Sequence, residues 1–598
     1  MTAFGKIWVV ALTMGASVSA MAQGGDGAAR KPLFGELHMH TRYSFDAYVF
    51  STRATPDEAY EFAKGKPLKH PLGKTYQISR PLDFMAVTDH ALYMGTFSKM
   101  GDKTHPLSKH PYAERVNSPD PDVAVTVFTD IIAARGKNFP EIAALIDPQV
   151  QKDTWDEIIA SANRHYDPGT FTTFIAYEWT STPDRQNLHR NVIFKGDTAP
   201  VPFSRIHSMA PEDLWDWMDR VRADGHEVLA IPHNSNLSDG RMFERETSLD
   251  KPFTAEYAAQ RNRNEPLVEV TQVKGTSETH PMLSPNDEFA DFELVEQRVA
   301  SKIQITSFKG SYVRDAYRTG LEFQDKEGFN PYRFGLLAAS DSHTGIIPIE
   351  ENNYSGKIGA RDGSPHNRLA KESATMDLRK FSASGLAGVW SEENTRESIY
   401  EAMRRKETWG TSGPRIKVRF FGGFDMDSVK PGEDGWVEAA YSSGVSMGGE
   451  LKAADADGAP TFAVWAMKDA ETANLDRIQI VKGWSKNGES QEQVYDVVWS
   501  GERVKDPSTG KVPAVGNTVN METLEYTNTI GAVELMGVWT DPDFNAEQNA
   551  FYYVRVLEIP TPRWSMFDAK ELGIPHPSDL HKTLQERAYT SPIWYDHH

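Results

Sequence analysis

Five short apolar segments of this chain are each followed by His, Asp or Glu, and this arrangement restricts the possible folds more than any other feature. The segments and the residues that follow them are 33–37 with His38 and His40, 84–87 with Asp89 and His90, 174–177 with Glu178, 228–231 with His233, and 336–339 with Asp341 and His343. His38 and His40 are two residues apart, so on a strand both imidazoles lie on one face. Because the carboxyl ends of strands in a parallel barrel meet at one rim, we expect these side chains to converge.

Residues 31–414 have the pattern of an α/β domain. Short apolar runs alternate there with helical stretches, which favours a mostly parallel sheet or barrel. Helices are expected at 211–221, 292–299 and 394–406. The polar stretches 93–122 and 345–384 are typical of surface insertions, which often cover active sites.

Residues 415–598 have a different pattern and predict a β-rich accessory region. The runs at 416–420, 461–465 and 552–556 are short, alternate in polarity and are separated by Gly, Asp and Asn turns. A sandwich would fit this pattern. We expect the C-terminal segment of this region to pack back on the first domain.

The composition excludes several classes of function. The chain has 64 Lys and Arg against 84 Asp and Glu, a formal net charge of −20, which repels phosphate backbones and argues against a nucleic-acid partner. It has no Cys, which excludes disulfides, thiolate-bound zinc, iron–sulfur clusters and a thiol nucleophile. Any metal must therefore be held by His, Asp and Glu.

Residues 1–22 have the layout of a secretory signal peptide. Lys6 precedes an apolar run, and Ala20-Met21-Ala22 supplies small residues for cleavage. We therefore predict an exported protein, periplasmic or secreted, with an uncleaved membrane anchor as the alternative. No later segment approaches the roughly 18 uninterrupted apolar residues of a membrane helix, so no span is expected after cleavage.

The five strand ends together indicate a metal site, although each element alone is weak evidence. A single His-x-His or Asp-His occurs by chance in a chain of this length. Burying so many imidazoles and carboxylates against one another is costly unless a cation neutralises them. Neutral imidazoles and carboxylates suit Zn²⁺, Mn²⁺ or Fe, and without a thiolate the choice stays open.

The same residues carry a resemblance to a known family. His38-Met39-His40-Thr41, Thr88-Asp89-His90, Glu178, Pro232-His233 and Asp341-Ser342-His343 resemble the ordered motifs of the polymerase-and-histidinol-phosphatase (PHP) superfamily of metal-dependent phosphoesterases. The segments 409–413 and 589–594 look like features of a large exported branch of it. The resemblance implies a distorted seven-stranded β/α barrel with two or three divalent metal ions.

The resemblance also implies roles for the ligand-type residues. His38 and His40 would hold a first metal with Asp341, and Glu178 would bridge it to a second metal. The other assignments are His189 and His233 at the second metal and His90 and His343 at a third.

Asp46 marks a departure from the family pattern. Many relatives have a His six residues after the His-x-His pair, where this chain has Asp46, which can also coordinate a metal. Asp89 is expected outside the coordination sphere, orienting a neighbouring imidazole through its other ring nitrogen.

Such a site predicts hydrolysis by a metal-bridging hydroxide, most strongly of phosphodiesters or small organophosphates. Lys274, Arg185 and Arg314 are the candidate substrate-binding cations, and Arg318 lies one helical turn beyond Arg314. Asp46, His90 and His343 are the candidates for protonating the leaving group.

Two other functions remain open at this point. The same metal centre could act on carboxylic esters, amides or sulfate esters, because a fold and its metals do not fix the electrophile. Alternatively, the chain could be a non-catalytic, metal-stabilised binding protein that uses its β-rich tail as an adhesion or carbohydrate module. For an enzyme, the expected partner is a small-molecule ester, and the oligomeric state is open.

Overall fold

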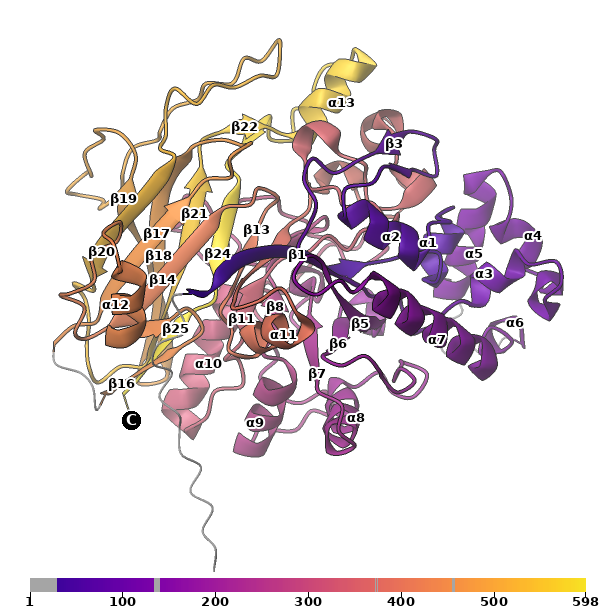
Figure 1. Ribbon diagram of the computed structural model, residues 1–598, viewed down its shortest axis with the longest axis horizontal. Coiled ribbons are helices and arrows are strands. Elements are labelled where there is room, and N and C mark those ends of the chain that lie inside the picture. The colour runs from indigo at the N-terminus through magenta and orange to yellow at the C-terminus, as the bar shows by residue number, and fades with distance from the viewer. Residues whose placement is uncertain (1–28, 134–139, 371–372, 374, 454–457, 598) are drawn as a thin grey trace, which may run out of the picture.

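The computed structural model describes residues 29–133, 140–370, 373, 375–453 and 458–597. The predicted signal peptide, residues 1–22, lies outside this part of the chain. Figure 1 shows a helix-rich part, indigo to magenta, beside a strand-rich part, orange to yellow.

A mixed, thirteen-stranded sheet runs through both parts of the molecule. Its main path is β16 (Glu450–Lys452), β25 (Ile593–Asp596), β21 (Ala550–Glu558), β24 (Arg587–Thr590), β13 (Thr408–Thr411), β12 (Leu386–Ser391), β1 (Lys31–Met39), β4 (Phe84–Val87), β5 (Thr172–Trp179), β6 (Arg190–Phe194) and β7 (Val228–Pro232). Off this path, β18 (Leu475–Lys486) pairs with β21 and with β19 (Glu489–Trp499). The protein is thus an α/β structure with additional β-rich regions.

The strands that precede the ligand-type residues run in one direction. β1, β4 and β5 pair in parallel, and β7 has the direction of β5 because β6 lies antiparallel between them. β7 lies against β8 (Leu267–Glu269), and β8 pairs in parallel with β11 (Gly335–Leu337). A parallel bridge joins Ser342, beyond β11, to Met39 at the end of β1. These contacts bring the end of β11 to the end of β1. The expectation of a mostly parallel sheet fails at β6 and β12, both antiparallel to their neighbours.

Helices cover the outer side of these strands (Figure 1). The longer helices of the chain are α2 (Pro56–Ala63), α5 (Pro121–Ala133), α7 (Pro148–His165), α8 (Pro211–Ala223), α9 (Ala255–Asn264), α10 (Val313–Glu327), α11 (Arg396–Arg404), α12 (Trp436–Ser443) and α13 (Trp564–Leu572). Shorter ones are α1 (Phe45–Val49), α3 (Thr96–Met100), α4 (Ala113–Val116) and α6 (Pro140–Ala143). α8 confirms the helix expected at 211–221, and it buries Leu214, Trp215, Met218 and Val221.

The helix expected at 292–299 is wrong. These residues lie in turns and irregular structure. Glu293 has a left-handed backbone, with φ of 44°, and its carboxylate pairs with Arg563 at 2.7 Å. The tertiary contact with the accessory region therefore overrides the local helical pattern. The helix expected at 394–406 is present as α11.

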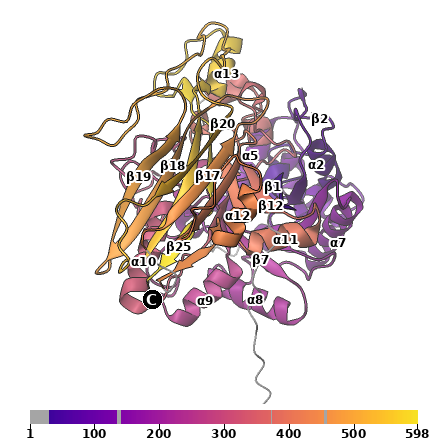
Figure 2. The same ribbon diagram turned by 60° about the vertical axis from the view of Figure 1, so that its left-hand side comes forward.

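The accessory strands form a second, four-stranded sheet of β15 (Val445–Ser446), β14 (Lys417–Gly423), β17 (Thr461–Met467) and β20 (Glu534–Thr540). Its inner side chains share a buried core with β18 and β21, including Phe420, Val464, Ile480 and Val554. Figure 2 shows these strands on the opposite side of the molecule from α2 and α7. β24 pairs antiparallel with β13, with Trp409 opposite Thr590, so the large sheet continues across residue 414.

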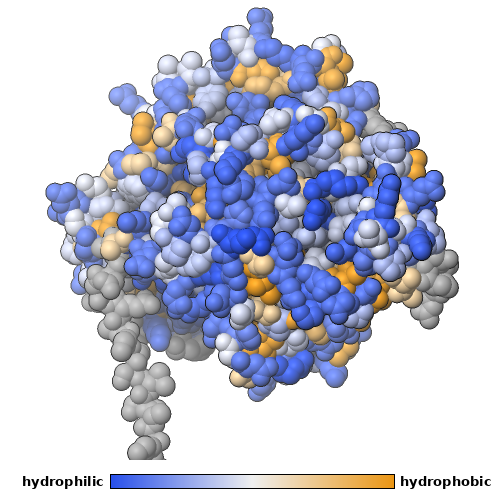
Figure 3. All heavy atoms as spheres, turned by 45° about the vertical axis from the view of Figure 1, so that its right-hand side comes forward, coloured by the Kyte–Doolittle hydropathy of each residue, from blue (hydrophilic) through white to orange (hydrophobic). Residues whose placement is uncertain are grey.

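None of the helices in the described part of the chain is long and apolar enough to cross a membrane. The face shown in Figure 3 is mainly hydrophilic, with small separate hydrophobic patches. Short two-stranded sheets complete the fold: β2 (Leu68–Lys69) with β3 (Thr75–Tyr76), β9 (Thr271–Gln272) with β10 (Gly275–Thr276), and β22 (Thr561–Pro562) with β23 (Thr583–Leu584).

Candidate metal centre

Nine ligand-type side chains gather where the parallel strands end. They are His38 in β1, His40 just after β1, Asp46 at the start of α1, His90 beyond β4, Glu178 in β5, His189 before β6, His233 after β7, and Asp341 and His343 beyond β11. His189 reaches this edge because β6 is antiparallel, so that its first residues lie beside the last residues of β5. Eight of the nine residues are buried, and Asp46 is half-buried.

Glu178 lies at the centre of the cluster. Its Oε1 is 2.5 Å from His189 Nδ1 and 3.2 Å from His233 Nε2. Its Oε2 is 3.1 Å from both His40 Nε2 and His90 Nδ1. One carboxylate thus faces imidazoles from four different strands.

Asp341 faces the pair on β1. Its Oδ1 is 3.4 Å from Nε2 of both His38 and His40. Asp341 has a left-handed backbone, with φ of 56°, which is uncommon outside glycine and turns the carboxylate toward β1 after the strand has ended.

Asp46 occupies a third corner of the cluster. Its Oδ2 is 3.0 Å from His343 Nε2 and 3.3 Å from His90 Nε2. The prediction placed these three residues together from the family resemblance alone.

The nitrogen and oxygen atoms fit divalent cations. Four sets of three residues have ligand atoms within 4.8 Å of one another: His38, His40 and Asp341; His38, Glu178 and His233; His90, Glu178 and His189; and His40, His90 and His343. His38 Nε2, His40 Nε2 and Glu178 Oε2 are buried and have no partner in hydrogen-bond geometry, although His40 Nε2 and Glu178 Oε2 lie only 3.1 Å apart. Such atoms are expensive to bury, and shared cations would satisfy all three.

Neighbouring polar groups fix the orientation of the two β1 imidazoles. Glu269 Oε2 lies 2.9 Å from His38 Nδ1, and Ser44 Oγ lies 2.8 Å from His40 Nδ1. Asp89 accepts hydrogen bonds from the backbone and hydroxyl groups of Thr41 and Ser44. Asp89 therefore acts on His40 through Ser44, which corrects the expectation of a direct contact with an imidazole.

The protonation states suit metal ligands. Burial raises the pKa of Glu178, but His90, His189 and His233 outweigh it and hold that pKa well below its usual range. Burial lowers the pKa of His38 well below 6.5, and it lowers that of His189 to about 4.

His40 is the exception among these imidazoles. Burial acts to lower its pKa, yet Asp341 and Glu178 raise it to about 9. A proton on His40 thus neutralises the two carboxylates, and a bound cation would take its place.

The three predicted substrate-binding cations lie in different environments. Lys274 lies in the cluster, with Nζ 2.6 Å from Asp341 Oδ2. Arg185 donates to the carbonyl oxygen of Ala300, a residue that lines the cavity above the cluster. Arg314 is fully buried and pairs with Glu278 and Asp287. Its expected contact with substrate is therefore wrong, because its guanidinium is enclosed by carboxylates of the protein.

Two residues of the cluster were absent from the predicted set. Lys357 Nζ lies 3.0 Å from Asp341 Oδ1 and 2.8 Å from His343 Nδ1. Lys357 comes from the irregular insertion 345–384, where no local pattern marks it. Glu269 ends the apolar strand β8, so the rule that found the other strand ends could have found it as well.

A cavity of about 90 Å³ lies over the cluster. His90, Glu178, Lys274, Asp341 and Lys357 form its polar side, and its apolar side includes Phe50, Phe128, Val299, Met376, Leu378 and Phe381. Insertion 345–384 supplies a large part of this wall, as expected for an insertion that covers an active site.

The family model described as "Protein of unknown function (DUF3604)" matches residues 27–597, so the chain belongs to that family. No curated protein is significantly similar to it. The chain is also similar to a two-domain protein from Bacteroides vulgatus ATCC 8482, described as containing a predicted PHP-like metal-dependent phosphoesterase. That match has 11% sequence identity, covers 80% of this chain and 90% of the other, and has a TM-score of 0.29. The interpretation of the site therefore depends on its own geometry.

Proposed function

We propose that this protein is a metal-dependent hydrolase, most specifically a phosphoesterase that acts on phosphodiesters or small organophosphates. The observation that carries the proposal is the convergence of the buried atoms His38 Nε2, His40 Nε2 and Glu178 Oε2, none of which has a partner in hydrogen-bond geometry. Together with Asp341, they give a donor set suited to two or three Zn²⁺, Mn²⁺ or Fe ions. When bound, such ions would supply Lewis-acid charge and lower the pKa of water.

The lysines of the cavity favour an anionic ester over a neutral one. Lys274 and Lys357 both point toward Asp341, one to each carboxylate oxygen, from two different segments. With Asp341 engaged by a cation, both ammonium groups could turn to the non-bridging oxygens of a phosphoester. A neutral carboxylic ester would interact with neither ammonium charge, so carboxylic esters are the weaker candidates for the substrate.

Asp46 and His343 lie where they could transfer a proton during the reaction. Burial lowers the pKa of His343 to about 3 despite the charge of Asp46, so this imidazole is neutral near pH 7. With Asp46 ionised as well, the pair can take up a proton from the attacking water at His343 Nε2 or Asp46 Oδ2, which lie 3.0 Å apart, and then pass that proton to a departing alkoxide.

Two broader expectations belong to this proposal. The ring β1, β4, β5, β6, β7, β8 and β11 supports the distorted seven-stranded barrel of the PHP resemblance. Residues 1–22 support a periplasmic or secreted location.

Elemental analysis followed by a paired substrate assay tests the function. Purified protein is expected to contain divalent metal and to hydrolyse bis-p-nitrophenyl phosphate in preference to p-nitrophenyl acetate. Glu178→Gln should lose bound metal and at least about a hundredfold in kcat/KM. Glu433→Gln, an exposed glutamate outside the cluster, is the matched control. Preference for the acetate would redirect the proposal to carboxylic esters, and metal-loaded protein inert on both esters would refute it.

A further inference from the structure

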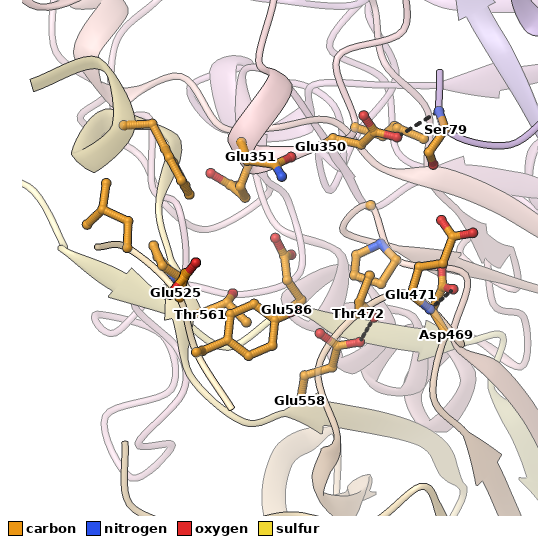
Figure 4. A pocket seen from close by; sticks show the side chains of 18 of the residues that line it. Ser79, Glu350, Glu351, Asp469, Glu471, Thr472, Glu525, Glu558, Thr561 and Glu586 are labelled. Atoms are coloured by element: carbon orange, nitrogen blue, oxygen red, sulfur yellow. Dashed lines mark hydrogen bonds between the residues drawn. The ribbon is translucent and has the colours of Figure 1, made fainter. Parts of the chain in front are cut away.

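A second, larger cavity of about 540 Å³ lies between the α/β part and the accessory region. The α/β part contributes Ser79, Arg80 and residues 349–352, and the accessory region contributes segments near 469–472, 523–526, 558–562 and 586. None of the metal-centre residues lines it. Figure 4 shows its acidic side chains around a common space.

Three glutamates form one wall of this cavity. Glu558 ends β21 and Glu586 precedes β24, and the backbone N–H of Glu558 donates to the carbonyl of Glu586 at 2.8 Å. Glu351 lies in a short 3₁₀ helix, Glu351–Asn353, of the insertion. The strand pairing thus holds two carboxylates side by side, and the insertion brings a third.

The Glu558 carboxylate has unused hydrogen-bonding capacity. Oε1 accepts a hydrogen bond from Thr472 Oγ1 at 2.7 Å, as Figure 4 shows, whereas Oε2 is buried without a partner. Glu558 is 0% exposed. A buried, unpartnered carboxylate oxygen in the wall of a cavity marks a place for a donor supplied from outside the chain.

No Lys, Arg or His forms an ion pair with these three glutamates in the part of the chain that the structure describes. Arg415 lines the cavity and donates to the carbonyl oxygen of Arg80 at 2.6 Å, and two arginines outside the lining also have other partners. Arg563 pairs with Glu293 at 2.7 Å, and Arg587 donates to the carbonyl oxygens of Gln585 and Phe289. The wall therefore holds three carboxyl groups whose charge, once they ionise, is not paired by any basic side chain among the described residues.

Other parts of the lining are different in character. Asp469 and Glu471 share the single guanidinium of Arg80, which offsets part of their charge. Leu524, Tyr526, Pro562 and Phe567 add apolar surface to the same cavity. A ligand that fits must therefore combine positive charge with a hydrocarbon portion.

We propose that this cavity binds a small organic cation, namely a diamine or polyamine whose ammonium groups contact Glu558, Glu586 and Glu351. A single metal ion fits less well, because among the described residues every His, Asp and Glu set with ligand atoms within 4.8 Å belongs to the metal centre. The volume also lies in the range of small-molecule sites.

The electrostatics of the cavity agree with a cationic ligand. Burial, with the charge of Asp469, raises the pKa of Glu558 to about 8, and burial, with the charges of Glu558 and Glu293, raises that of Glu586 to about 8. Near pH 7 both carboxyl groups are therefore mainly protonated, and a bound ammonium group would replace these protons and favour the ionised form.

Isothermal titration calorimetry of the full, metal-loaded protein with putrescine and spermidine tests the site. We expect saturable, single-site binding with Kd of about 1 mM or tighter. Glu558→Gln should weaken binding about tenfold or more, the loss expected for one charge-assisted hydrogen bond. Glu586→Gln should do the same and serves if Glu558→Gln does not fold.

Glu522→Gln is the matched control, since Glu522 is exposed in the same accessory region and does not line the cavity. It should bind like the parent protein. Absence of saturable amine binding, an affinity in the Glu558 and Glu586 variants equal to that of the parent protein, or binding of Ca²⁺ in place of the amines would each overturn the proposal. All these outcomes are independent of ester hydrolysis, so the two proposed functions fail separately.

Discussion

On the accessible side of the cluster, the Asp46 carboxylate contacts the imidazoles of His343 and His90. Asp46→Asn should therefore change both the rate of ester hydrolysis and the pH dependence of that rate. The substitution keeps the size of the side chain but removes the charge that faces His343 and His90. We expect kcat to fall by about a hundredfold, the usual contribution of a positioned proton-transfer group. The measurement is the pH-rate profile on bis-p-nitrophenyl phosphate, with metal content in parallel and the exposed Asp120→Asn as control. An unchanged rate and profile would remove Asp46 from the mechanism.

Glu36 predicts a pH-dependent stability. Burial raises its pKa from 4.5 to about 8, against hydrogen bonds from the backbone of Ser340 and His38. A carboxyl with a raised folded-state pKa contributes stability fully below its unfolded pKa, and this contribution is lost as pH rises through about 8. Glu36→Gln cannot ionise, so relative to the parent it should gain about 3 kcal/mol in free energy of unfolding between pH 5 and pH 9.

Urea denaturation of chelator-treated protein at both pH values measures this gain. Glu433→Gln should show no such difference, because that side chain is exposed. A constant gap between the Glu36 variant and the parent would mean that Glu36 ionises normally in the folded protein.

Single residues of the metal centre were predictable where their position depends on strand geometry. His38, His40, Glu178 and Asp341 follow or end apolar strands, and parallel strands bring such ends to one edge. Lys357 could not be found, because an irregular insertion carries it to Asp341. Arg314 was assigned wrongly because its spacing from Arg318 is the same on an exposed helix and on a buried one.

At the scale of elements, insertion 345–384 depends on a tight turn that positions Lys357. Asp362 accepts hydrogen bonds from the backbone of Lys357 and Ile358, and Gly359 has φ of 46°. A Cβ at Gly359 would lie 2.2 Å from the carbonyl oxygen of Phe50, which cannot move as a flexible side chain would. Gly359→Ala should therefore cost about 2–4 kcal/mol of stability and displace Lys357.

Chemical denaturation and kcat/KM measured together check this expectation. Gly169→Ala is the matched control: Gly169 also has positive φ, 89°, but a Cβ there would meet nothing within 4 Å. It should cost only about 1 kcal/mol and leave activity unchanged. Equal losses in the two variants would show that the backbone conformation, and not the contact with Phe50, decides the effect.

Elements with strong periodicity were predicted well, and those held by distant contacts were not. The apolar stripe of α8 is local, so 211–221 identified the helix. The direction of β6 is decided by its neighbours β5 and β7, and the turn at 292–299 by the ion pair of Glu293 with Arg563. Neither contact can be inferred from the residues next to these segments.

For the whole molecule, a buried ion cluster joins the α/β part to the accessory region. Asp287 and Glu278 belong to the former, and Arg555 of β21 belongs to the latter. Arg555 Nη2 is 2.7 Å from Asp287 Oδ1, and Arg314 Nη2 is 2.9 Å from Asp287 Oδ2. Both arginines are 0% exposed. Each buried guanidinium pairs with both carboxylates, so loss of either carboxylate would remove one partner from both arginines, and this cluster should couple the unfolding of the two parts.

Asp287→Asn tests that coupling. Burial raises the pKa of Asp287, but Arg555 and Arg314 outweigh it and hold the pKa below its usual range. The stabilisation by a carboxylate with a depressed pKa is present above about pH 4 and is lost as pH falls below that value. At pH 7 the free energy of unfolding of the variant should therefore be lower by about 3 kcal/mol, the lower end for breaking a buried ion pair, and this loss should shrink toward pH 3.

Denaturation curves at the two pH values measure the loss of stability, with Asp291→Asn, 62% exposed at its side chain, as control. Metal content should stay unchanged in both variants, because Asp287 lies outside the metal centre; an equal loss at both pH values would show that its charge does not hold the two parts together.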